Sequence, residues 1–135
     1  PAAAARPAAP QRALQEASAA GVARVRAQRD AQEAEDAERL RLKDSVDARL
    51  AQWTAGKDGN VRALLSSIDD AQFGLLWPEL RWKKVGMHEL VTDAQVKRAY
   101  TRAIARLHPD KQGGASVEQR MLATGMFHAL NSAYT

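Results

Sequence analysis

The segment His108-Pro109-Asp110-Lys111 places an imidazole, a carboxylate and an amine within four residues. An imidazole can act as a general base or bind a metal, and a carboxylate can accept a directional ion pair from a cation. No second metal ligand and no nucleophile lies near His108 in the sequence, so we expect neither catalysis nor a metal site, and no cofactor. A role in binding geometry is the favoured interpretation.

Two predicted helices hold this segment. Pro109 ends the first helix, because proline has no N–H and forces the preceding residue out of the α region. The capping box Thr92-Asp93-Ala94-Gln95 predicts the start of that helix, which runs to about Leu107. A second capping box, Ser116-Val117-Glu118-Gln119, opens a helix that runs to the chain end. Two helices joined by a short turn predict an antiparallel hairpin.

The first of these helices has an apolar face and a basic face. Its apolar positions are Val96, Tyr100, Ala103 and Leu107, flanked by Ala99 and Ile104. The opposite side carries a basic ridge that leads to the turn and consists of Lys97, Arg98, Arg102 and Arg106. The predicted apolar stripe of the second helix is Ala123, Phe127, Leu130 and Tyr134, with Met126 beside it. A basic ridge alone is usually a solvated face, but beside this turn a protein-binding face is favoured.

A short helix and a loop precede the hairpin. Asn60 is a good N-cap for a helix at residues 61–68, whose apolar side is Val61, Leu64, Leu65 and Ile68. Residues 69–79 are predicted to be a loop, since Trp77-Pro78 argues against helix there. Its apolar side chains, together with one just beyond it, are expected to pack over the core; they are Phe73, Leu76, Trp77 and Trp82. The pair Lys83-Lys84 is expected to be solvated.

The first part of the chain differs in composition. Residues 1–10 contain three prolines and no apolar pattern, so a disordered linker end is predicted. Residues 11–53 contain no proline and predict a long charged helical arm, supported by pairs such as Arg29 and Glu33. An apolar stripe near its end is expected to dock on a domain at residues 54–135; it consists of Leu42, Val46, Leu50 and Trp53. A coiled coil is the less favoured alternative, because no heptad pattern continues through the charged middle.

Length and composition limit the possible fold class, partners and location of the chain. The 135 residues fit one small all-α domain with an extension. The net charge of +4 is compatible with an acidic partner, whether nucleic acid, an anionic membrane or a protein groove. The absence of cysteine excludes disulfides and fits a reducing compartment, and no apolar run is long enough for membrane insertion. The chain begins with Pro1 and stops inside a helical pattern, so we expect a fragment of a longer protein.

The ridge, the His-Pro-Asp-Lys turn and the helix after it resemble a J-domain. The likeness is most specific to the auxilin group, whose pattern Trp-x-x-Gly-Lys-x-x-Asn-Ile-Arg-Ala-Leu-Leu-Ser is matched by residues 53–66. It continues through residues 82–87, 90–92 and 95–97, so that it covers Trp53 to Tyr134. The Trp77-Pro78-Glu79 loop is similar to plant and algal versions rather than to animal ones.

The resemblance implies an all-α J-domain with an auxilin-type loop behind the helical arm. J-domains are co-chaperones rather than enzymes: they bind an Hsp-70 family chaperone in its ATP state and stimulate its ATP hydrolysis. The basic helix lies on an acidic groove of the chaperone, and the turn reaches the seam between its domains. The chaperone-binding residues implied by position are Lys97, Arg98, Arg102, Arg106, His108, Pro109, Asp110 and Lys111.

The sequence departs from the auxilin pattern in two respects. Thr101 stands where auxilins often have a basic residue and Arg106 where they are commonly apolar, so one charge is moved along the ridge. The segment between Ser66 and Trp77 is also longer than usual by a few residues, which leaves its packing open.

Auxilins direct the chaperone to clathrin coats in the cytoplasm, so coat disassembly is the expected function. No clathrin-binding motif is visible, and any coat contact is expected from regions outside this chain. The alternatives are an auxilin-like J-protein acting in chloroplast movement, a basic helical module that binds nucleic acid, and a scaffold without chaperone coupling. Nucleic acid is disfavoured as a partner because Asp110 would repel phosphate, and the intact His-Pro-Asp argues against a scaffold.

Overall fold

A computed structural model describes residues 9–135. This part of the chain is helical and contains no strand, which confirms the predicted all-α class. The linker predicted at residues 1–10 lies outside the described residues, except for Ala9 and Pro10. The chain divides into two compact units, residues 1–38 and residues 39–135.

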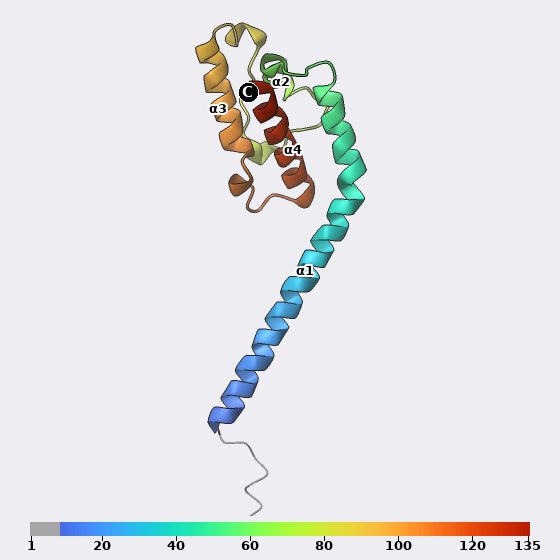
Figure 1. The fold of residues 1–135 in the computed structure, drawn as a ribbon, viewed down its shortest axis with the longest axis vertical. Helices are drawn as coiled ribbons and strands as arrows, with labels where there is room; N and C mark the ends of the chain where they lie inside the picture. The colour runs from blue at the N-terminus through green and yellow to red at the C-terminus, as the bar shows by residue number, and fades with distance from the viewer. Residues whose placement is uncertain (1–8) are drawn as a thin grey trace, which may run out of the picture. The chain divides into compact units, whose positions relative to one another are not determined.

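Helix α1 (Ala9–Thr54) is the longest element (Figure 1). It begins two residues before the predicted start, because proline is tolerated in the first turn, where an N–H would have no intrahelical partner. Within the first unit its polar contacts run along an exposed surface. Arg29 Nε lies 4.0 Å from Glu33 Oε1, as predicted, and Gln32 donates to Asp36 at 2.8 Å. Pairs of this kind stabilise a helix by roughly 0.2–0.5 kcal/mol each, so this segment relies on local interactions.

The second unit contains three further α-helices: α2 (Val61–Ser67), α3 (Asp93–Leu107) and α4 (Val117–Tyr134). Three short 3-10 helices join them: η2 (Pro78–Leu80), η3 (Met87–Glu89) and η4 (Pro109–Lys111). Helices α3 and α4 form the predicted hairpin, and α2 packs against both (Figure 1). Both predicted capping boxes are present. The Thr92 hydroxyl accepts from the Gln95 N–H and the Ser116 hydroxyl from the Gln119 N–H, each at 3.1 Å.

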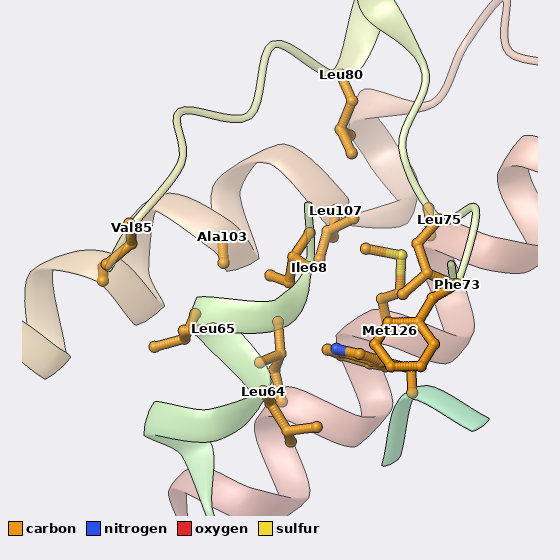
Figure 2. Packing of buried hydrophobic residues seen from close by; sticks show 14 of the residues in the cluster. Leu64, Leu65, Ile68, Phe73, Leu75, Leu80, Val85, Ala103, Leu107 and Met126 are labelled. Atoms are coloured by element: carbon orange, nitrogen blue, oxygen red, sulfur yellow. The ribbon is translucent and has the colours of Figure 1, made fainter. Parts of the chain in front are cut away.

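The core draws side chains from every α-helix of the second unit (Figure 2). Val46 and Trp53, two members of the stripe predicted on α1, are 2% and 0% exposed. The buried Trp53 ring also keeps its polar atom satisfied, since the indole N–H donates to Ser67 Oγ at 3.0 Å. The last turns of α1 are therefore part of this core, as the stripe predicted.

The apolar faces of the hairpin differ from the prediction at one aromatic position, Tyr134. Helix α3 buries Val96, Ala99, Ala103 and Leu107, and helix α4 buries Leu122, Ala123, Met126 and Leu130. Tyr100 and Phe127 are only half-buried, and Tyr134 is exposed. Tyr100 and Phe127 pack against the edge of the core, which agrees with their place on the predicted apolar faces. The prediction was wrong for Tyr134, because small and aliphatic side chains fill the space between the helices and leave this ring outside the core.

The connection between α2 and α3 has little regular structure but contributes much of the core. It buries four aliphatic side chains at five-residue intervals, Leu75, Leu80, Val85 and Leu90. The prediction that this loop packs over the core is confirmed. Phe73 is buried in the core, and three partly buried side chains pack against the core: Leu76, Trp77 and Trp82. Lys83 and Lys84 are exposed, as expected, and Lys84 Nζ lies 3.7 Å from Asp69 Oδ2.

Helix α1 approaches α4 closely at Gly125. A Cβ atom at this position would lie 2.2 Å from Leu50 Cδ1, so the absence of a side chain is what lets Leu50 reach the α4 backbone. Nearby, the Arg49 guanidinium donates to the carbonyl groups of Phe73 and Gly74 and pairs with Glu118. One arginine thus links α1, the loop and the start of α4.

We expect Gly125→Ala to lower the free energy of unfolding by about 1–3 kcal/mol, because the added methyl overpacks the contact with Leu50. In a Leu50→Ala background the same change should be neutral or stabilising, since the space is vacated and alanine favours helix over glycine by roughly 1 kcal/mol. Urea unfolding followed by tryptophan fluorescence measures both. An equal decrease in the free energy of unfolding in the two backgrounds would show that Leu50 does not pack against Gly125.

Candidate functional site

The His-Pro-Asp segment forms the corner between α3 and α4. The His108 N–H makes the last bond of α3, donating to the Ile104 carbonyl at 2.9 Å. His108 then turns into extended backbone, with φ −55° and ψ 136°, as expected for a residue before proline. Pro109–Lys111 continue as η4, and the carboxylate of Asp110 projects into solvent with 87% of its side chain exposed.

The imidazole of His108 is fixed by two contacts. Its Nδ1 accepts the Asp110 N–H at 3.1 Å, which places the proton of the neutral ring on Nε2. The ring also meets Phe127 of α4 edge to face, with centroids 5.5 Å apart and planes at 86°. The ring therefore has a defined orientation, with Nε2–H as its available donor.

Gln112, which sequence reasoning missed, is a buried part of this corner. It is 6% exposed, and its side-chain amide donates to the Arg106 carbonyl at 2.7 Å and, more weakly, to the His108 carbonyl at 3.4 Å. Nothing in the local pattern distinguishes it, because a glutamine before Gly113-Gly114 is typical of an exposed turn. Its role depends on where α3 ends, which only the structure shows.

The predicted basic ridge lies on the solvent face of α3. Lys97, Arg98, Arg102 and Arg106 are all exposed, opposite the buried positions of the same helix. Lys111 is exposed in η4. Within residues 9–135, no acidic side chain lies within ion-pair distance of these five cations. The site residues named from the sequence thus share one helix and the corner that follows it.

A hollow borders the end of this ridge. Its walls are the Trp77–Leu80 stretch, the last turns of α3 and the segment from Lys111 to Ala115. Arg102, Arg106 and Lys111 line it together with one carboxylate, that of Glu79. The loop therefore stands beside the basic surface. Over the described residues there is no cluster of three or more His, Asp or Glu side chains that could hold a metal.

The comparisons with known proteins agree with this geometry. The chain is 45% identical over 100 residues to UBA domain-containing protein 7 of Schizosaccharomyces pombe. It is 38% identical over 101 residues to an Arabidopsis thaliana J domain-containing protein required for chloroplast accumulation response. It is 36% identical over 97 residues to an auxilin-like clathrin uncoating factor of Saccharomyces cerevisiae, and other Arabidopsis relatives are named auxilin-related or auxilin-like.

The chain contains an auxilin-type J-domain. These matches cover 73%, 73% and 71% of the chain, whereas the chain spans only 14% of the length of each of these three relatives. No family model matches it. Because the relatives come from plants and yeasts, the closer likeness to plant than to animal versions stays a prediction.

The auxilin-specific residues before the J-domain hairpin have structural roles. Lys57 Nζ donates to the Trp53 carbonyl at 2.6 Å at the end of α1 and lies 4.8 Å from the centre of the Phe73 ring. Asn60 Oδ1 accepts the Ala63 N–H at 3.0 Å and caps α2. Arg62 donates to the Leu90 carbonyl at 2.9 Å. The residues that identify the group thus build the scaffold, and the ridge and corner lie elsewhere.

A tyrosine pair closes the hairpin at its open end. The rings of Tyr100 and Tyr134 stack with centroids 4.0 Å apart, and the Tyr100 hydroxyl donates to Asn131 Oδ1 at 3.0 Å. Burial, and secondarily the charge of Tyr134, raises the pKa of Tyr100 above its usual range. The charged form is therefore disfavoured in the folded state, so this group's contribution to stability is complete below about pH 10 and is lost above it.

We expect Tyr134→Phe, which leaves Tyr100 as the sole tyrosine, to titrate above the ordinary tyrosine midpoint, because burial is the larger cause of the shift. Alkaline titration followed by tyrosinate absorbance measures the midpoint, and the urea-unfolded protein is the control. Identical midpoints for the folded and unfolded variant would show that packing in the hairpin does not desolvate Tyr100.

Proposed function

We propose that this chain acts as a co-chaperone that binds an Hsp-70 family chaperone in its ATP state and stimulates its ATP hydrolysis. The supporting observation is the continuous exposed surface formed by the basic ridge of α3 and the His108–Asp110 corner. In this proposal the chain has no active site of its own and is not an enzyme. The chaperone-binding residues are Lys97, Arg98, Arg102, Arg106, His108, Pro109, Asp110 and Lys111.

The ridge and the corner contribute differently to this function. The ridge carries exposed charges, so it should speed association with an acidic groove in a salt-dependent way. The corner holds the His108 ring in a defined orientation and presents the exposed Asp110 carboxylate beside it, with Oδ2 3.6 Å from His108 Nδ1, which suits directional contacts with the chaperone. By binding one chaperone conformation better than the others, the corner would raise the population that hydrolyses ATP.

For the longer protein we propose a cytoplasmic role in clathrin-coat disassembly, with coat contacts supplied by regions outside this chain. The observation in favour is the relative named a clathrin uncoating factor. A second candidate is a role in chloroplast movement, favoured by the relative required for chloroplast accumulation response. Both would use the same chaperone chemistry and differ in the client.

Neither nucleic-acid binding nor membrane insertion is part of the proposal. The Asp110 carboxylate stands at the end of the ridge, next to Lys111, where it would repel phosphate. Among residues 9–135, no helix combines the length and apolarity needed to cross a bilayer. Salt-dependent DNA binding that survives Asp110→Asn would favour the nucleic-acid alternative.

The deciding experiment is single-turnover ATP hydrolysis by a cytosolic Hsp-70 chaperone with and without this chain. We expect stimulation by the wild type and its loss in His108→Gln and in Asp110→Asn. Losing a charge partner that the complex would bury costs about 2–5 kcal/mol of the stabilisation that favours the hydrolysing conformation, so the maximal stimulated rate with Asp110→Asn should fall at least about 30-fold. Unchanged circular dichroism of both variants is the control. No stimulation by the folded wild type would refute the co-chaperone function.

We expect Arg102→Ala to weaken chaperone binding by roughly 0.2–1 kcal/mol, as for an exposed charge, and to reduce its dependence on salt. Lys43→Ala is the matched control, because Lys43 is an exposed cation of α1 that pairs with Asp47 at 2.5 Å. Surface plasmon resonance at low and moderate ionic strength measures both. Equal effects of the two substitutions would place the chaperone on another face of the domain.

A further inference from the structure

The end of α3 leaves backbone carbonyl groups without intrahelical donors, directly beside the His108–Asp110 corner. The last carbonyl groups of any α-helix have no intrahelical donor and must be satisfied by other groups. Here the break at Pro109 falls directly after the helix, and proline supplies no N–H. The missing proline N–H leaves the Ala105 carbonyl without its usual donor. The usual donor of the Arg106 carbonyl would be the Asp110 N–H, which bonds to His108 Nδ1 instead, so this carbonyl in the last turn of α3 needs a donor from outside the helix.

Gln112 provides that donor and is itself anchored at three further points. Its side-chain amide reaches the Arg106 carbonyl at 2.7 Å and approaches the His108 carbonyl at 3.4 Å. Its backbone N–H donates to the Pro109 carbonyl at 3.1 Å, and its own carbonyl accepts the Ala115 N–H at 3.0 Å. The residue thus ties the end of α3, the 3-10 turn and the approach to α4 together.

The burial of Gln112 indicates that its side chain has one defined position in the fold. Within the described residues it is the only buried polar side chain, at 6% exposure, while its neighbours Lys111 and Gly113 are exposed. A buried amide is stable only where its polar atoms are paired, so its position is set by the carbonyl groups it meets. Moving the amide would require moving the corner.

We infer that Gln112 is a positioning residue for the His108–Asp110 corner, acting through the end of α3 rather than by touching the chaperone. This inference rests on the proposed co-chaperone function. The amide holds the backbone from which the imidazole and the carboxylate project, so its loss should allow the corner several arrangements. The exposed ridge would still form the complex, but only a fraction of the bound complexes would hold Asp110 and the His108 Nε2–H in the productive geometry.

The first test uses the chain alone and does not depend on the chaperone. In Gln112→Met, which has similar size but no donor, the Asp110 amide should lose its bond to His108 Nδ1. Heteronuclear NMR should show an upfield shift and faster exchange of that amide, and the imidazole nitrogens should shift toward a mixture of tautomers. An Asp110 amide and imidazole identical to those of the wild type would overturn the inference, whatever the chaperone assay shows.

The second test separates positioning from simple loss of stability. In single-turnover assays, Gln112→Met should lower the maximal stimulated rate roughly tenfold while half-saturation stays within about threefold, because the ridge is unchanged. Asn60→Ala is the matched control: it removes the cap of α2 and destabilises the domain away from the corner. Partial unfolding reduces the active concentration and so raises half-saturation without lowering the maximal rate.

Further variants keep the inference testable if Gln112→Met folds poorly. Gln112→Asn retains the amide but shortens its reach, and should lower the maximal rate less than methionine does. Gln112→Glu removes the donor and places a carboxylate against two carbonyl groups, so it should lower the maximal rate more than the other variants do. A maximal rate that is the same for all folded variants would overturn the inference, whereas wild-type chain without any stimulation would refute the proposed function instead.

Discussion

The packing of α3 through two alanines sets the position of the basic ridge and of the His108–Asp110 corner. Ala99 and Ala103 are 1% and 0% exposed, and their small side chains let α3 lie close to α2 and α4. A helix held along one face has no freedom to rotate, so the opposite face is fixed as well. The ridge points into solvent because these alanines are buried, and the corner begins where the same helix ends.

The domain separates residues that build the structure from residues available to a partner. Trp53, Asn60 and Arg62 belong to the stretch that most resembles the auxilin group, and each is used inside the fold: in the core, at a helix cap and in a link to the Leu90 carbonyl. The cations of the ridge and the Asp110 carboxylate are exposed to solvent instead. The residues that most resemble the auxilin group therefore build the scaffold, and the surface proposed to bind the chaperone is a separate exposed segment.

Much of this arrangement follows from local sequence rules. The capping boxes at Thr92 and Ser116, the break at Pro109 and the α1 stripe ending at Trp53 were all predictable, because each depends on residues close in sequence. The exposed basic ridge followed from helical periodicity in the same way. What such rules describe is the order of the helices and the direction of their faces.

Other features depend on contacts between distant segments and could not be predicted. Leu80 and Val85 are buried in a connection without helical or strand periodicity, so no pattern marks them as core residues. Phe127 lies on the apolar face as predicted, but its edge-to-face contact with His108 depends on how the two helices meet and was not predictable. Gln112 looks like an exposed turn residue until the end of α3 is placed beside it.

The regular spacing of buried side chains in the α2–α3 connection has a consequence for how the domain tolerates change. Leu75, Leu80, Val85 and Leu90 anchor this connection to the core, so residues added between any two of them would displace an anchor. Ala71 and Gln72 lie ahead of the first anchor, are exposed and belong to a turn. Loop tips of this kind accept insertions most readily. A short peptide tag or fluorescent label inserted there would report on the domain in cells while leaving the hairpin and its corner undisturbed.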